Sequence, residues 1–162
     1  TDGWSLRARV TDNNGDGGDY TRASIDLRNA WTVDRWVIGS RLAWTGSPRG
    51  MLPIYDGAGL GGFLNLSAYS TNQVAGDSLR YGHVRAERVI GTMPAGLRGD
   101  LRVGTALELA RIGAPFVTTR HTGLLQSVMV YVGGDSPIGP VYLGAAHSLT
   151  GVVNAYLFIG SP

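Results

Sequence analysis

The sequence contains no cysteine and no lysine, and it has few charged residues of any kind. Without cysteine, the chain can form neither a disulfide framework nor a thiolate metal site or thiol nucleophile. Charged residues make up 16% of the chain, whereas about a quarter of the residues of a typical soluble domain are charged. Something other than charge must therefore keep this protein dispersed.

Long apolar runs are also missing. No run approaches the roughly 18 residues that a transmembrane helix requires, and residues 1–20 lack the basic and apolar regions of a signal peptide. The start at Thr1 is typical of a trimmed or mature chain. These absences leave a membrane location open, because the strands of a membrane barrel carry only a weak signal of alternating residues.

The basic residues are 14 arginines, and the formal net charge is +2. A nucleic-acid-binding surface requires clustered basic residues with aromatic side chains among them. These arginines are instead spread along the chain. We therefore expect no nucleic-acid partner.

Glycine is abundant, with 25 scattered residues that indicate many turns. Between the glycines, apolar and polar residues alternate with the period of two that is typical of β-strands, and no window of a dozen residues has helical periodicity. The alternation recurs in eight segments: 4–10, 22–28, 35–44, 79–90, 101–109, 124–133, 141–148 and 152–160. The sequence predicts an all-β fold of eight antiparallel strands, with residues 1–162 forming one domain.

Alternation alone does not say whether the apolar face lies inside, as in a soluble sandwich or barrel, or outside, as in a membrane barrel. Two features favour the membrane barrel. The polar face mixes arginine with small residues and a few acids, which is typical of a polar lumen. The apolar face carries tryptophans near the strand ends, as in interfacial aromatic girdles, at Trp4, Trp31, Trp36 and Trp44. We therefore predict a transmembrane β-barrel in the outer membrane of a Gram-negative bacterium, with the lipid bilayer as a partner.

Membrane barrels alternate long external loops with short periplasmic turns. With a periplasmic N-terminus, the external connections are expected at 11–19, 45–78, 112–122 and 148–151. The periplasmic turns are expected at 29–30, 91–99 and 134–140. The longest connection, 45–78, then falls on the external side.

Part of this long connection resembles a known family. Residues 61–69 (GGFLNLSAY), followed by 74–76 (VAG), resemble the inward-folding loop of the bacterial surface antigen family, whose outer-membrane barrels assemble or secrete proteins. Residues 133–144 and 155–160 resemble the final two hairpins of one branch of that family, the patatin-like (type Vd) autotransporters. The likeness extends from about Gly59 to the C-terminus.

The resemblance implies that 45–78 folds back into a lumen through a motif of Gly61, Gly62, Leu66, Ser67, Ala68 and Tyr69. The family loop carries an arginine that reaches acidic residues of the barrel wall, and Leu66-Ser67-Ala68-Tyr69 lacks it. The family barrel has sixteen strands, within the even-numbered series of bacterial barrels. This chain would then supply half of one, completed by a second copy in a homodimer or by a missing N-terminal half.

Several polar residues invite a catalytic interpretation. Glu87 and Glu108 could form an acid–base pair. Because the sequence places them among arginines, we predict instead that they belong to a charge network in the lumen. The predicted members of this network are Arg41, Arg85, Glu87, Arg102 and Glu108. Gly76-Asp77-Ser78-Leu79 spells an esterase signature without that family's surrounding elements. The three histidines, His83, His121 and His147, lie on separate segments. We therefore expect no metal site.

Asp56-Gly57-Ala58 resembles an element of patatin lipases, but no Gly-x-Ser-x-Gly nucleophile motif accompanies it. We therefore expect no catalysis and no cofactor. The function that the sequence predicts is the translocator or pore segment of a patatin-like secretion protein, with a passenger domain upstream. Two alternatives remain open: a free-standing small barrel that acts as an adhesin or structural protein, and a small outer-membrane hydrolase.

Overall fold

The computed structural model describes residues 2–14, 18–92, 99–116, 123–136 and 139–160. Ten strands and one short 3-10 turn, η1 (Ile54–Asp56), account for the regular structure of these residues. The long strands are β1 (Gly3–Asn13), β2 (Tyr20–Val33), β3 (Trp36–Arg49), β6 (Leu79–Thr92), β7 (Asp100–Ile112), β8 (Leu124–Ser136), β9 (Gly139–His147) and β10 (Val153–Ile159). Two short strands, β4 (Ala58–Leu60) and β5 (Val74–Gly76), lie in the connection between β3 and β6. Within the described ranges, no helix is long and apolar enough to cross a membrane.

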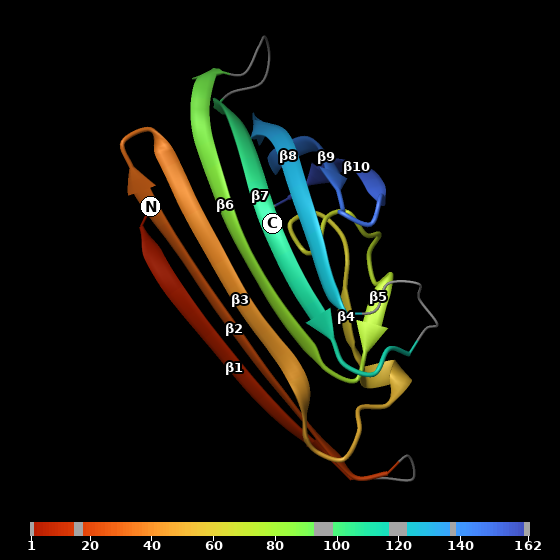
Figure 1. Ribbon diagram of the computed structural model, residues 1–162. Helices are drawn as coiled ribbons and strands as arrows, with labels where there is room; N and C mark the ends of the chain where they lie inside the picture. Colours follow the sequence, from red (N-terminus) through yellow and green to blue (C-terminus); the bar gives the residue numbers. More distant parts are fainter. Residues whose placement is uncertain (1, 15–17, 93–98, 117–122, 137–138, 161–162) are drawn as a thin grey trace.

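The eight long strands form one antiparallel sheet in the order β1-β2-β3-β6-β7-β8-β9-β10. The predicted all-β fold with eight antiparallel strands is therefore confirmed. Figure 1 shows that the sheet is strongly curved and that the chain between β4 and β5 lies on its concave side. The outermost strands, β1 and β10, each have one neighbour and do not pair with each other. By itself the chain thus forms an open sheet. An even number of eight strands would be enough for a closed barrel, but this sheet does not close.

The predicted turn at residues 29–30 is wrong. Both residues lie inside β2, and the hairpin turns at Asp34, whose φ of 56° is in the left-handed region. Asn29 is a polar residue among apolar neighbours on its face, which made the strand seem to end there. The side chains of Asn29 and Ser40 satisfy each other across β2 and β3, since the Ser40 hydroxyl donates to Asn29 at 2.9 Å.

Other predicted boundaries also shift. The predicted connection 45–78 begins too early, because β3 continues to Arg49. Most of the predicted turn 134–140 belongs to β8 and β9. Most of 91–99 and of 112–122 lies outside the described residues.

The two faces of the sheet differ in composition and in exposure. The face on the convex side, here called the outer face, exposes large apolar side chains along every long strand. They include Leu6, Ile25, Trp31, Leu42, Val84, Leu107, Val130, Leu143 and Leu157. The opposite, inner face carries Arg7, Asp26, Arg41, Arg85, Glu108, Ser127 and Tyr156. The buried hydrophobic cluster lies between this inner face and the chain from β4 to β5.

Candidate functional site: the inner segment and its anchor

Residues 58–76, here called the inner segment, form a tightly wound hairpin. Its two short strands pair antiparallel, with Ala58 opposite Gly76 and Leu60 opposite Val74. The chain reverses at Gly61, whose φ is 126°, and a Cβ there would lie only 1.8 Å from the carbonyl oxygen of Ser70. Only glycine fits such a left-handed, crowded position.

A single carboxylate of the sheet holds the tip of the inner segment. Glu108 on β7 is 1% exposed, and it accepts hydrogen bonds from the backbone N–H groups of Leu66 at 3.0 Å and Ser67 at 2.5 Å. The hydroxyl of Tyr81 on β6 donates to the same carboxylate at 2.9 Å. Hydrogen bonds to an ionised acceptor are stronger than neutral ones, so three of them compensate for much of the cost of burying the charge.

The neighbouring contacts extend this anchor across β8 and β10. The backbone N–H of Ala68 donates to the hydroxyl oxygen of Ser127 at 2.9 Å. The hydroxyl of Tyr156 lies 2.6 Å from the carbonyl oxygen of Ser67 and 3.0 Å from that of Tyr69. Three successive N–H groups thus turn toward the sheet, an arrangement that favours an anionic or oxygen acceptor.

Backbone N–H groups, and no arginine of the inner segment, bind the buried carboxylate of Glu108. Leu66 has a φ of 71°, which helps to turn its own N–H and that of Ser67 toward the same carboxylate. Tyr69 is fully buried, and its hydroxyl lies 3.3 Å from that of Thr150. The inner segment therefore reaches the acidic wall residue without any positively charged side chain of its own.

Aromatic packing fixes the other side of the inner segment. Phe63 stacks on Phe158 with 5.0 Å between the ring centroids, and it makes edge contacts with Tyr131 and Tyr156. Glycine makes room for the tyrosines, because a Cβ at Gly104 would lie 2.4 Å from the Tyr131 ring. Such ring pairs stabilise by about 0.5–1.5 kcal/mol each beyond their buried area.

The predicted charge network separates into distinct groups. Arg85 pairs with Glu87 at 3.1 Å, and the hydroxyl of Tyr131 also donates to Glu87. Arg41 pairs with Asp26 on β2 at 2.6 Å and donates to the side chain of Asn65 in the inner segment at 3.2 Å.

The two remaining members of the predicted network lie apart from these pairs. Glu108 binds the inner segment, and none of the ion pairs among the described residues includes it. Arg102 lies 3.9 Å from the exposed carboxylate of Asp100, away from the inner segment's anchor. The anchor therefore depends on one of the five predicted charges.

The partners that sequence reasoning missed are mostly tyrosines. Tyr81, Tyr131 and Tyr156 all occupy inner-face positions, and each hydroxyl binds the inner segment or a buried carboxylate. Their signal was present in the alternation, which puts them on the polar face. However, tyrosine is classed as hydrophobic when a sequence is read for alternation, so the pattern does not predict the hydrogen bonds of its hydroxyl group.

The residues of the enzyme-like motifs have structural contacts. Ser78 donates to Asp77, which also accepts from the backbone N–H of Ala114 and so holds two connections together. Asp56 pairs with Arg22 at 2.6 Å. His83 lies 2.9 Å from the Tyr81 hydroxyl, His147 is on the outer face of β9, and His121 lies outside the described residues. In the described ranges, no group of three or more candidate ligands could hold a metal ion.

No family model, curated protein or solved structure matches this chain. The features of this chain that bear on its function are the two faces of the sheet, the edges of the sheet and the inner segment.

Proposed function

We propose that this chain is part of an outer-membrane β-barrel of a Gram-negative bacterium. In this proposal it acts as the translocator or pore segment of a protein-secretion barrel similar to the patatin-like autotransporters, without catalytic activity of its own. The observation that carries the proposal is the inversion of the two sheet faces. The outer face exposes large apolar side chains, whereas the inner face carries charged side chains and, where the inner segment covers it, packs against that segment through apolar and aromatic side chains.

The exposed apolar surface of the outer face is large and therefore unfavourable in water. Leu107 is 60% exposed and Leu157 is 71% exposed, and similar residues continue across the sheet. Soluble monomers rarely expose contiguous apolar patches beyond a few hundred Å², because burying one large apolar side chain is worth about 1.5–3 kcal/mol. A hydrocarbon environment around the outer face removes this cost without further protein.

The edges of the sheet add a second requirement. Strands β1 and β10 each leave one side without a neighbouring strand, and unpaired backbone groups are very costly in lipid. We propose that further strands, from a second copy or from elsewhere in the polypeptide, pair with both edges and close a wider barrel. A closed eight-stranded barrel has room only for its own side chains, whereas here the inner face is also packed against a hairpin.

The inner segment favours a translocator or pore over a free-standing adhesin. Its tip is held by hydrogen bonds to Glu108 and Ser127 and by aromatic contacts, none of them covalent. Such a segment is suited to being displaced when a chain passes. The hydrolase alternative has no support from Asp56 or Ser78, because Asp56 pairs with Arg22 on β2 and Ser78 donates to the neighbouring Asp77.

Cysteine scanning tests the proposal cleanly because the chain has no cysteine of its own. With the protein folded into lipid vesicles, we expect Leu107→Cys on the outer face to be protected from a water-soluble maleimide. The matched inner-face variant Ser24→Cys should react readily, because Ser24 lines an open, polar recess beside Arg22. Equal labelling of the two variants, with the protein shown to be folded, would overturn the membrane assignment.

A further inference from the structure

The outer face is grooved in the middle of the sheet, near the end that carries the inner segment's connections. The groove has a volume of about 560 Å³ and extends from Leu6 on β1 to Leu124 on β8, with most of its lining on β2, β3, β6 and β7. Gly82 contributes no side chain at its floor, and Ile25, Leu42, Leu109 and Leu124 form apolar walls. Strands added beyond β1 or β10 would pair edge to edge with the sheet and would leave this groove on its outer face uncovered.

Two arginines stand at one end of the groove. Arg80 on β6 and Arg111 on β7 are exposed and lie directly opposite each other in the sheet register. Like charges that face each other across two strands repel. The ion pairs among the described residues use Arg22, Arg28, Arg41, Arg85 and Arg102. Within that part of the chain, Arg80 and Arg111 therefore have no carboxylate partner.

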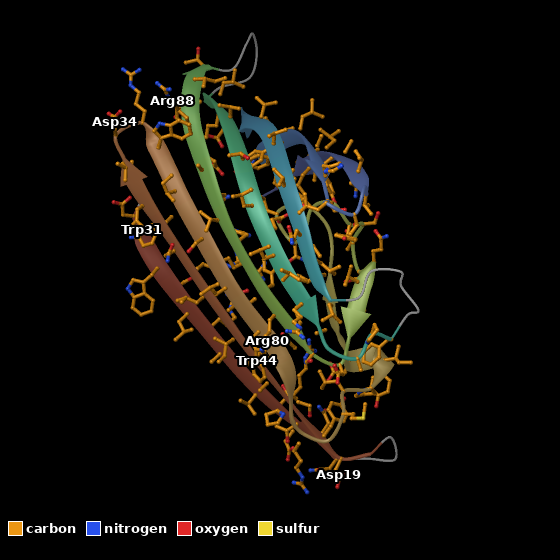
Figure 2. All side chains as sticks on the ribbon, viewed as in Figure 1. Asp19, Trp31, Asp34, Trp44, Arg80 and Arg88 are labelled. Atoms are coloured by element: carbon orange, nitrogen blue, oxygen red, sulfur yellow. The ribbon has the colours of Figure 1, made fainter. Side chains whose placement is uncertain are left out.

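Trp44 marks the level of this arginine pair. It is the register partner of Arg80, and Figure 2 shows the two side chains near each other. At the other end of the same strand, Trp36 is the register partner of Arg88, whose guanidinium lies 5.6 Å from the tryptophan ring. The two tryptophans are eight residues apart on β3, or about 26 Å along the strand. This is of the same order as the apolar band of about 25 Å in outer-membrane barrels.

We propose that the groove binds a phosphate-bearing lipid, with an acyl chain along Leu42, Gly82 and Leu109 and the phosphate between Arg80 and Arg111. The inference rests on the proposed function, since it requires the outer face to lie in a bilayer. Guanidinium groups match phosphate geometry with paired N–H donors. An anion at this point offsets the repulsion of the two arginines and the cost of keeping them beside hydrocarbon.

The test uses tryptophan fluorescence and brominated lipids, which quench on contact. Replacing three tryptophans (Trp4→Phe, Trp31→Phe and Trp36→Phe) leaves Trp44 as the only reporter beside the groove. The protein is folded into phosphatidylcholine vesicles that contain equal fractions of brominated phosphatidylglycerol or brominated phosphatidylcholine. We expect the anionic lipid to quench Trp44 more strongly than phosphatidylcholine does, because each arginine should raise its local concentration by about fivefold.

Two controls separate a specific site from general attraction to an anionic surface. Arg80→Gln combined with Arg111→Gln should make both lipids quench Trp44 equally, whereas Arg88→Gln at the other end should not. A variant that keeps only Trp31, which has Ile38 as its register partner on β3, should show no preference between the lipids.

The outcomes distinguish the two proposals. Equal quenching of Trp44 by both lipids in the parent variant would overturn the lipid site and leave the membrane assignment standing. An anionic preference that survives the double glutamine variant would also overturn the site. Absence of quenching by either lipid at both Trp44 and Trp31, in folded protein, would overturn the proposed function and the lipid site with it.

Discussion

Glu108 is the side chain on which docking of the inner segment depends. Its carboxylate takes three hydrogen bonds from uncharged donors, two of them backbone N–H groups. Because both oxygens accept, an amide at this position has to present its NH₂ group to at least one N–H donor. The same geometry means that a small change in this one side chain leaves at least one buried N–H group without an acceptor.

We expect Glu108→Gln to loosen the tip of the inner segment by about 2–3 kcal/mol, the cost of unsatisfied donors and a lost charged acceptor. Hydrogen exchange at the amides of Leu66 and Ser67 should become roughly 30- to 150-fold faster, because a loss of about 2–3 kcal/mol raises the equilibrium constant for local opening by that factor. Glu87→Gln is the matched control, since Glu87 pairs with Arg85 and Tyr131. Unchanged exchange at both amides in Glu108→Gln would show that the carboxylate is not the anchor.

Gly61 offers a second test at the level of one residue. An alanine there must accept a φ of 126° and a contact of 1.8 Å with a backbone oxygen, so we expect Gly61→Ala to cost more than about 2 kcal/mol. Gly91→Ala is the control, because a Cβ at Gly91 meets nothing within 4 Å. Denaturant unfolding in detergent micelles should rank the two variants in this order, and equal midpoints would contradict it.

At the scale of elements, the strands were predictable and their ends were less so. Alternation identified all eight long strands because the outer face carries apolar side chains and the inner face carries most of the charged ones, and a period of two records that difference directly. The ends depend on local hydrogen bonds, as the pair Asn29 and Ser40 inside the β2–β3 hairpin shows. The partners of the inner segment depend on contacts between residues about 40 to 90 positions apart, which no local pattern encodes.

The inner segment is expected to be a separable element that rests on β8. With Ala68→Cys and Ser127→Cys together, we expect a disulfide under mild oxidation, because the Ala68 N–H lies 2.9 Å from the Ser127 hydroxyl and a bridge requires Cα atoms about 4.4–6.8 Å apart. Gel mobility with and without reductant measures it. Ala68→Cys with Ala30→Cys, whose second site lies on β2, should form none, and failure of the first pair to cross-link would contradict the docked position.

At the scale of the whole molecule, the open sheet predicts association through its edges. We expect a variant with Ala8→Cys on β1 and Ala155→Cys on β10 to give intermolecular disulfides in membranes, as two copies close one wide barrel. Ala8→Cys with Ala86→Cys is the control, because β6 lies inside the sheet and has both neighbours. Mass analysis of the oxidised products distinguishes the cases, and exclusively intramolecular Ala8–Ala155 bridges would show that eight strands suffice.

If the proposed barrel forms a pore, the uncovered part of the inner face sets its ion selectivity. The inner segment rests on β7 and β8, while Arg7, Arg9 and Arg22 line an open recess between β1, β2, β3 and the inner segment. An aqueous pathway bounded by such a wall attracts anions and repels cations. Across a planar bilayer with a KCl gradient, we expect the zero-current voltage to have the sign of chloride permeation and to shift toward zero with Arg7→Gln and Arg9→Gln together. A voltage of the opposite sign in the unmodified protein would mean that another surface sets its permselectivity.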